Sequence, residues 1–141
     1  ITDEMTHALT LAAKRGVDVR IITPGIPDKK QIYNITRSFY HGLVKDGVRI
    51  YEWTPGFCHA KMSVADDCMA TCGTINLDYR SLYHHFENGC FMTDCDAVLD
   101  IRNDLEATMK ECREVTEKYR VGRSAYLRLG QLFMRLFAGL L

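Results

Sequence analysis

Residues 59–76 read HAKMSVADDCMATCGTIN, and this stretch decides both the fold and the chemistry expected of the chain. Two β-forming runs flank the acidic pair Asp66-Asp67, a pattern that predicts a hairpin with a two-residue turn. Residues two apart on a strand project to the same face, so we expect His59 and Lys61 to lie side by side. Asn76 follows the returning run, and the hairpin would bring it back beside that pair.

An imidazole, an ammonium group and a carboxamide that converge on one point suit a phosphodiester. Lys61 and Asn76 would neutralise and hydrogen-bond the non-bridging oxygens, whose charge grows in the transition state. The imidazole of His59 could attack phosphorus or carry a proton to the leaving oxygen. This chemistry requires no metal, and no acidic metal cluster is visible in the sequence, so we expect no cofactor.

The same stretch resembles the signature of the phospholipase D superfamily, which is H-x-K-x4-D followed by x6-G-[ST]-x-N. Both gaps are correct, and all six positions match, at His59, Lys61, Asp66, Gly73, Thr74 and Asn76. The resemblance implies that the substrate phosphate is held by His59, Lys61, Thr74 and Asn76. It also implies that Asp66 belongs to the catalytic motif mainly as a residue that holds the turn.

Members of this superfamily also have an acidic side chain that orients the motif histidine. Glu87, in the run HHFENG, stands at the corresponding position. A carboxylate on one ring nitrogen would fix the tautomer of His59 and stabilise its charged form. The resemblance therefore implies a catalytic set of His59, Lys61, Asp66 and Glu87, whereas the adjacent His84 and His85 are expected to be rim or structural residues.

Longer stretches, among them ALTLAAKRGVDVRIITPGIPDK and GTINLDYRSLYHHFENG, resemble the second half of bacterial cardiolipin synthases. This resemblance implies a phosphatidyl transfer that joins two phosphatidylglycerol molecules into cardiolipin plus glycerol, through a phosphohistidine. The implied partners are phosphatidylglycerol and other anionic phospholipids, a membrane surface, and an N-terminal half with a first motif or a second copy of the chain. The implied location is the bacterial cell membrane, with the catalytic domain on its cytoplasmic side.

The sequence holds one such motif, so we expect a piece of a longer two-motif enzyme that is inactive alone. One alternative is a homodimeric single-motif phosphodiesterase, phospholipase D or nuclease, in which two copies complete the site. A second is an inactive isolated fragment. The 18 basic and 18 acidic residues give a formal net charge of zero, which counts against nucleic acid as a partner.

The expected fold class is α/β, a phospholipase D-like half-domain that has a mixed sheet flanked by helices and lacks the first strand. This domain would span residues 1–118, and an amphipathic tail over 119–141 would either lie in the membrane interface or pack on the domain. Periodicity predicts helices over 2–15, 29–45 and 96–118, and strands over 17–23, 48–53 and 88–94. The six cysteines form no C-x-x-C pair and are expected to be reduced and buried.

Overall fold

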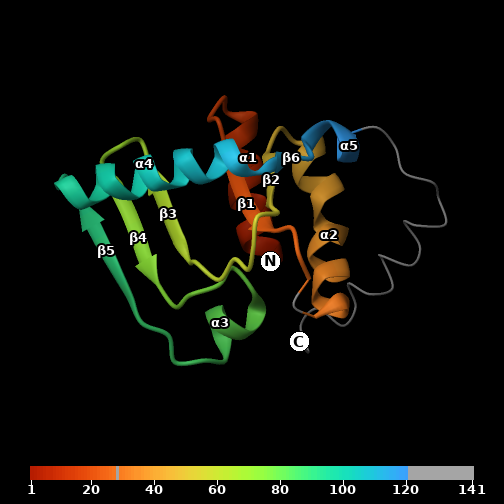
Figure 1. The fold of residues 1–141 in the computed structure, drawn as a ribbon, viewed down its shortest axis with the longest axis horizontal. Coiled ribbons are helices and arrows are strands. Elements are labelled where there is room, and N and C mark those ends of the chain that lie inside the picture. Colours follow the sequence, from red (N-terminus) through yellow and green to blue (C-terminus); the bar gives the residue numbers. More distant parts are fainter. Residues whose placement is uncertain (28, 121–141) are drawn as a thin grey trace.

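The computed structural model describes residues 1–27 and 29–120, in which the strands form two separate three-stranded sheets (Figure 1). The first sheet has the order β1-β2-β6, with β1 (Arg20–Pro24) parallel to β2 (Arg49–Trp53) and β2 antiparallel to the two-residue β6 (Arg113–Glu114). Helix α2 (Lys30–Lys45) makes the crossover that parallel neighbours require.

The main core forms where α2 packs on β2 and on the short helix α5 (Thr116–Arg120). Helix α1 (Asp3–Lys14) adds Leu9 and Ala13 to this core. Thr2 caps α1 by accepting a hydrogen bond from the Met5 backbone N–H at 3.2 Å. The buried members of the core are Phe39, Tyr40, Leu43, Val44, Val48, Ile50, Val115 and Tyr119.

The second sheet is the antiparallel array β3 (Met62–Ala65), β4 (Met69–Gly73) and β5 (Gly89–Thr93). Asp66 and Asp67 have φ values of 50° and 56°, the left-handed conformation that a tight hairpin turn needs. Figure 1 shows α4 (Asp96–Glu111) lying across this sheet, where Ala70 and Val98 are buried. The short helix α3 (Tyr79–Tyr83) lies beyond the end of the sheet that is opposite the hairpin turn (Figure 1).

The predicted α/β class, with helices flanking mixed β-structure, is confirmed, but the predicted helix over 96–118 is wrong at its C-terminal end. Helix α4 stops at Glu111, and Cys112 turns extended with ψ of 155°. The chain then pairs with β2 as β6, because Arg113 reaches the carboxylate of Glu52 at 2.7 Å. Val115 consequently belongs to the main core and not to the inner face of α4.

Glu52 is a fully buried carboxylate on β2, and two arginines hold it. Its Oε1 accepts from Arg37 at 2.9 Å and 2.7 Å, and its Oε2 accepts from Arg113 at 2.7 Å. A buried charge is tolerated only when it is paired and hydrogen-bonded in this way. The triad therefore ties α2, β2 and β6 together.

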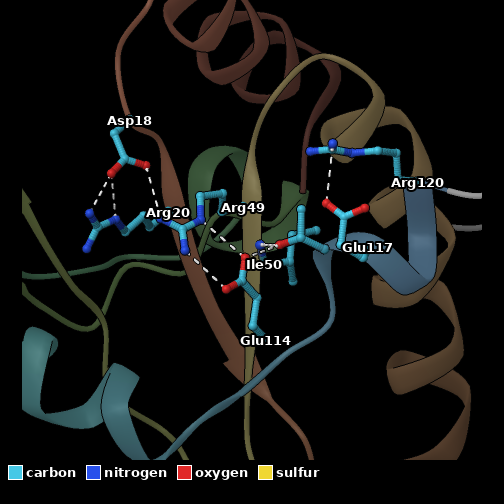
Figure 2. Close-up of polar contacts among 8 residues, drawn as sticks. Asp18, Arg20, Arg49, Ile50, Glu114, Glu117 and Arg120 are labelled. Atoms are coloured by element: carbon cyan, nitrogen blue, oxygen red, sulfur yellow. Dashed lines mark hydrogen bonds and ion pairs between the residues drawn. The ribbon is translucent and has the colours of Figure 1, made fainter.

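A second set of charged side chains crosses the same sheet nearer its surface (Figure 2). Arg20 donates to Asp18, and Arg49 donates to Glu114 at 3.2 Å and 3.1 Å. The hydrogen bond from Arg49 lowers the pKa of Glu114 below its ordinary value of 4.5. These pairs are half exposed, so each contributes little to stability, and the Arg49–Glu114 pair helps to register β6 against β2.

The predicted amphipathic tail lies outside the described residues, apart from its first two positions in α5. Within residues 1–27 and 29–120, no helix is both long and apolar enough to cross a membrane.

Candidate active site

The first half of the motif lies just before β3, on the segment that leads in from β2. The ladder between β3 and β4 continues one residue beyond the strand, because the Gly73 N–H donates to the Lys61 carbonyl at 3.1 Å. Lys61 therefore stands opposite Gly73, and His59 lies two residues earlier, more exposed to solvent. Strand β3 begins at Met62, later than predicted, so His59 and Lys61 precede the strand instead of lying within it.

The side chains of this first half are available for a ligand. The Lys61 Nζ donates to the His59 carbonyl oxygen at 2.7 Å, which uses one of its three donors. The His59 ring stacks on Phe57 with centroids 5.7 Å apart and makes no hydrogen bond to another described residue. Both polar groups can thus turn toward an incoming phosphate without breaking an ion pair.

Asp66 occupies the hairpin turn at the other end of β3. Five residues of extended chain separate it from Lys61, about 16 Å at the rise of a strand. The carboxylate of Asp66 is therefore not brought to the site, and its position in the chain is that of a turn residue.

The second half of the motif leaves β4 as the strand meets β5. A Cβ on Gly73 would lie 2.3 Å from the Asn88 carbonyl oxygen and 2.5 Å from the Gly89 Cα, so only glycine fits between these backbones. One residue later, the Thr74 N–H donates to the Asn88 carbonyl at 2.8 Å. The motif glycine thus allows β4 and β5 to approach closely where they enter the site.

The hydroxyl of Thr74 is already engaged. It accepts from the Asn88 N–H at 3.0 Å and donates to the carboxylate of Glu87. The side chain of Asn76 is exposed and forms no hydrogen bond to His59 or Lys61 in the described structure. The sequence predicts that His59, Lys61 and Asn76 converge. They lie at the same end of the second sheet, but their side chains form no hydrogen bonds to one another.

The sequence predicts that Glu87 pairs with His59, but in the described structure its carboxylate has other partners. Its carboxylate contacts Thr74, Ser81 and the Nδ1 of His85, the last at 3.7 Å. The hydrogen bond from Thr74, followed by that from Ser81, lowers the pKa of Glu87 below its ordinary value of 4.5. The carboxylate is therefore charged at neutral pH and is held beside the motif threonine, Thr74.

Sequence reasoning missed Ser81, a buried residue that links α3 to the site. Its N–H donates to Asp78 Oδ1 at 2.8 Å, which caps α3, and its side chain hydrogen-bonds to Glu87. The available signal was the spacing Asp78-x-x-Ser81, since an aspartate three residues ahead of a short helical run is a typical N-cap. This cap fixes where the chain turns between Asn76 and Glu87.

Two further features of the described residues are the lack of a metal-binding cluster and an apolar groove. Within the part of the chain that the structure describes, no three or more His, Cys, Asp or Glu side chains group closely enough to hold a metal ion. A groove of about 400 Å³ runs between α1 and α3 and is lined mainly by the apolar side chains of Met5, Ala8, Leu82 and Tyr83.

Comparisons with known proteins extend these observations. Residues 1–109 match the family model described as the cardiolipin synthase, PLD-like domain. An uncharacterized protein of Streptococcus mutans is 49% identical over 141 residues, which are 100% of this chain and 31% of that protein. The cardiolipin synthase of Clostridium perfringens is 37% identical over 142 residues, covering 100% of this chain and 30% of the synthase. Cardiolipin synthase 2 of Bacillus cereus is 34% identical over 139 residues, which are 99% of this chain and 27% of that protein.

Among solved structures, the chain is similar to Nuc, a phospholipase D family member from Salmonella typhimurium. The TM-score is 0.71 at 16% sequence identity, and the match covers 80% of this chain and 74% of that chain. This likeness confirms the predicted phospholipase D-like fold. The chain spans less than a third of the length of the curated relatives it matches.

Proposed function

Because the chain belongs to the cardiolipin synthase, phospholipase D-like family, we propose that it is one catalytic half of a phosphatidyl transferase. The reaction joins two phosphatidylglycerol molecules into cardiolipin and releases glycerol. The observation that carries this proposal is the hydrogen bond between Gly73 and Lys61, which joins the two halves of the motif at one end of the second sheet.

The chemistry proceeds in two displacements at phosphorus. An imidazole attacks the phosphate of the first lipid, and the bond from phosphorus to the glycerol headgroup oxygen breaks as a second imidazole protonates that oxygen. The headgroup hydroxyl of the second lipid then attacks the phosphohistidine, the phosphorus–nitrogen bond breaks to free the first imidazole, and the hydroxyl proton passes to the second imidazole. His59 serves as one of these two groups, and Lys61 and Asn76 stabilise the non-bridging oxygens.

This scheme needs two imidazoles on opposite sides of phosphorus, and the chain supplies one motif. We assign the other to a further half of a longer protein, consistent with relatives more than three times as long. The isolated chain should accordingly show little transfer. Anionic phospholipid is the substrate, and the site works at the bacterial membrane, on the cytoplasmic side.

The assay measures cardiolipin formation from phosphatidylglycerol vesicles by the full-length protein that carries this sequence. His59→Ala should lower the rate by at least about 10²-fold, because the imidazole acts in the transition state. His7→Ala is the matched control, since His7 is an exposed imidazole on α1, and it should leave the rate unchanged. A His59→Ala protein that keeps more than a tenth of the wild-type rate would contradict the assignment.

A second candidate is a homodimeric single-motif phosphodiesterase or phospholipase D. The likeness to Nuc favours it, because that chain is of similar size and is matched over 74% of its length. Gel filtration combined with hydrolysis of bis(p-nitrophenyl) phosphate separates the two. Turnover of bis(p-nitrophenyl) phosphate by a dimer of this chain alone supports the second candidate. The first candidate is supported if the chain alone acts on neither this compound nor phosphatidylglycerol, while the full-length protein forms cardiolipin.

A further inference from the structure

Two cysteines face each other across adjacent strands next to the motif. Cys72 on β4 is the register partner of Cys90 on β5, and both are free thiols on exposed residues, so the prediction that the cysteines are buried is wrong here. Cys72 immediately precedes Gly73, and Cys90 immediately follows Gly89. We refer to Cys72 and Cys90 as the cysteine pair, and the proposed transfer reaction uses neither of them.

The ladder sets the distance between the two backbones. Backbone hydrogen bonds of 2.8 Å at the opposed pairs Cys68–Asp94 and Thr74–Asn88 flank the cysteine pair on either side. Opposed pairs in an antiparallel ladder alternate between hydrogen-bonded and non-bonded, so the cysteine pair belongs to the hydrogen-bonded set. Its Cα atoms are then about 5.5 Å apart, and disulfides most often join Cα atoms about 5.5–6 Å apart.

The neighbouring pair, Gly73 and Gly89, belongs to the closer, non-bonded set. A Cβ on Gly73 would meet the Gly89 Cα at 2.5 Å. Opposed Cβ atoms lie about 4.5–5.5 Å apart, with hydrogen-bonded pairs near the wide end, whereas a disulfide needs about 3.5–4.5 Å. Closing the remaining ~1–2 Å strains the bond, and strained, exposed disulfides are the readily reduced ones.

We propose that the cysteine pair is a reversible oxidation site, at which a hydroperoxide forms a cross-strand disulfide. One thiolate attacks the peroxide, the O–O bond breaks, and a sulfenic acid and water result. The second thiolate attacks that sulfur, the S–O bond breaks, and the oxygen leaves as a second water. Two thiols and one hydrogen peroxide thus give one disulfide and two waters.

The position gives this oxidation a consequence for the motif. The disulfide ties β4 to β5 one residue before Gly73 and one residue after Gly89, and so restrains the two strands next to the Thr74–Glu87 contact. A thiol reductant restores the free strands. This inference concerns the sheet alone and stands whether or not the proposed transfer reaction is correct.

Peptide mapping of the oxidised chain tests the proposal. Trypsin cleaves after Lys61, Arg80 and Arg102, so residues 62–80 and 81–102 form separate peptides with two cysteines each. In Cys68→Ser/Cys95→Ser only the cysteine pair remains in these two peptides. Hydrogen peroxide followed by alkylation should yield the linked peptides, lighter by two hydrogens than their sum and separated by dithiothreitol.

The folded chain should form this link at least about tenfold faster than the same chain in guanidinium, because the ladder holds the thiols in place. Cys72→Ser/Cys90→Ser keeps the other two cysteines and should form no comparable link between the same peptides. If Cys68→Ser/Cys95→Ser fails to fold, fragmentation spectra of the oxidised wild-type peptides locate the bond instead. The proposal is overturned by no link at Cys72 and Cys90, by equal rates with and without guanidinium, or by a wild-type link that runs mainly through Cys68 or Cys95.

Discussion

The glycine of the motif permits a sharp test of how the site is built, through Gly73→Ala. The added methyl would lie 2.3 Å from the Asn88 carbonyl oxygen and 2.5 Å from the Gly89 Cα, both of them backbone atoms. To reach ordinary contact the two strands must separate by about 1 Å. The Thr74–Asn88 hydrogen bond of 2.8 Å would then stretch beyond hydrogen-bonding distance.

The expected cost follows from these two effects. Forcing a methyl into a closed space typically costs about 1–3 kcal/mol, and loss of a backbone hydrogen bond adds about 1 kcal/mol. We therefore expect the free energy of unfolding of Gly73→Ala to fall by roughly 2–4 kcal/mol, which lowers Tm by about 8–15 °C in a chain of this size. Circular dichroism during thermal and urea unfolding measures both quantities.

Gly42→Ala is the matched control. Gly42 lies inside α2, has no atom within 4 Å of its would-be Cβ, and does not have positive φ. Alanine there should stabilise the chain by about 0.5–1 kcal/mol, because glycine is the poorer helix former. If Gly73→Ala unfolds at the wild-type temperature while Gly42→Ala behaves as expected, the strands can separate at no cost, and the argument that this glycine brings β4 and β5 together is wrong.

Four further predictions concern charge and the site. Glu52→Gln should lower the free energy of unfolding by about 3 kcal/mol, because it removes the carboxylate charge and leaves the mostly buried Arg37 without its anionic partner. Denaturant unfolding measures this change. The pKa of Glu114 is lowered in the fold, so its contribution to stability is complete above pH 4.5 and is lost as the pH falls below that value; the slope of unfolding free energy against pH should flatten there in Glu114→Gln. Glu87→Gln should leave the fold intact and lower turnover of the full-length protein, because an amide holds Thr74, next to the motif glycine, less firmly than the carboxylate does; a lower Tm with undiminished activity per folded molecule would make Glu87 structural. Turnover should also survive exhaustive chelation at fixed ionic strength, and strict dependence on a transition metal would contradict the proposed role of Lys61.

The sequence predicts the helices α1 and α2 and the hairpin turn well, because each carries a local signal. Thr2 and Gly16 bound the first helix, and Gly16 takes the positive φ of 95° that a helix end favours. The acidic turn is read from Asp66 and Asp67, whose short polar side chains tolerate the left-handed region. Such signals depend only on neighbours in the chain, so periodicity and turn chemistry recover them.

The end of α4 could not be predicted in the same way. Residues 112–118 continue a helical pattern, yet Arg113 and Glu114 leave it for partners more than 60 residues away, Glu52 and Arg49. Nothing local to the segment marks this change, because the competing interactions exist only in the folded chain. The pairing of Glu87 was missed for the same reason, since the carboxylate meets Thr74 across the ladder.

The six motif positions therefore divide into two groups with different physical demands. Gly73 and Thr74 are fixed by backbone hydrogen bonds and close packing, and Asp66 by the turn, so the fold alone determines where they lie.

The remaining motif side chains are held far less tightly. The His59 ring and the Asn76 amide form no hydrogen bond within the described structure, and Lys61 is held only by a carbonyl oxygen two residues away. Groups left unpaired at the end of a hydrogen-bonded hairpin gain most from a ligand that brings negative charge and several acceptors, as a phosphate does. Substrate, and the surface that supplies the second imidazole, would then complete a site whose framework the hairpin has already built.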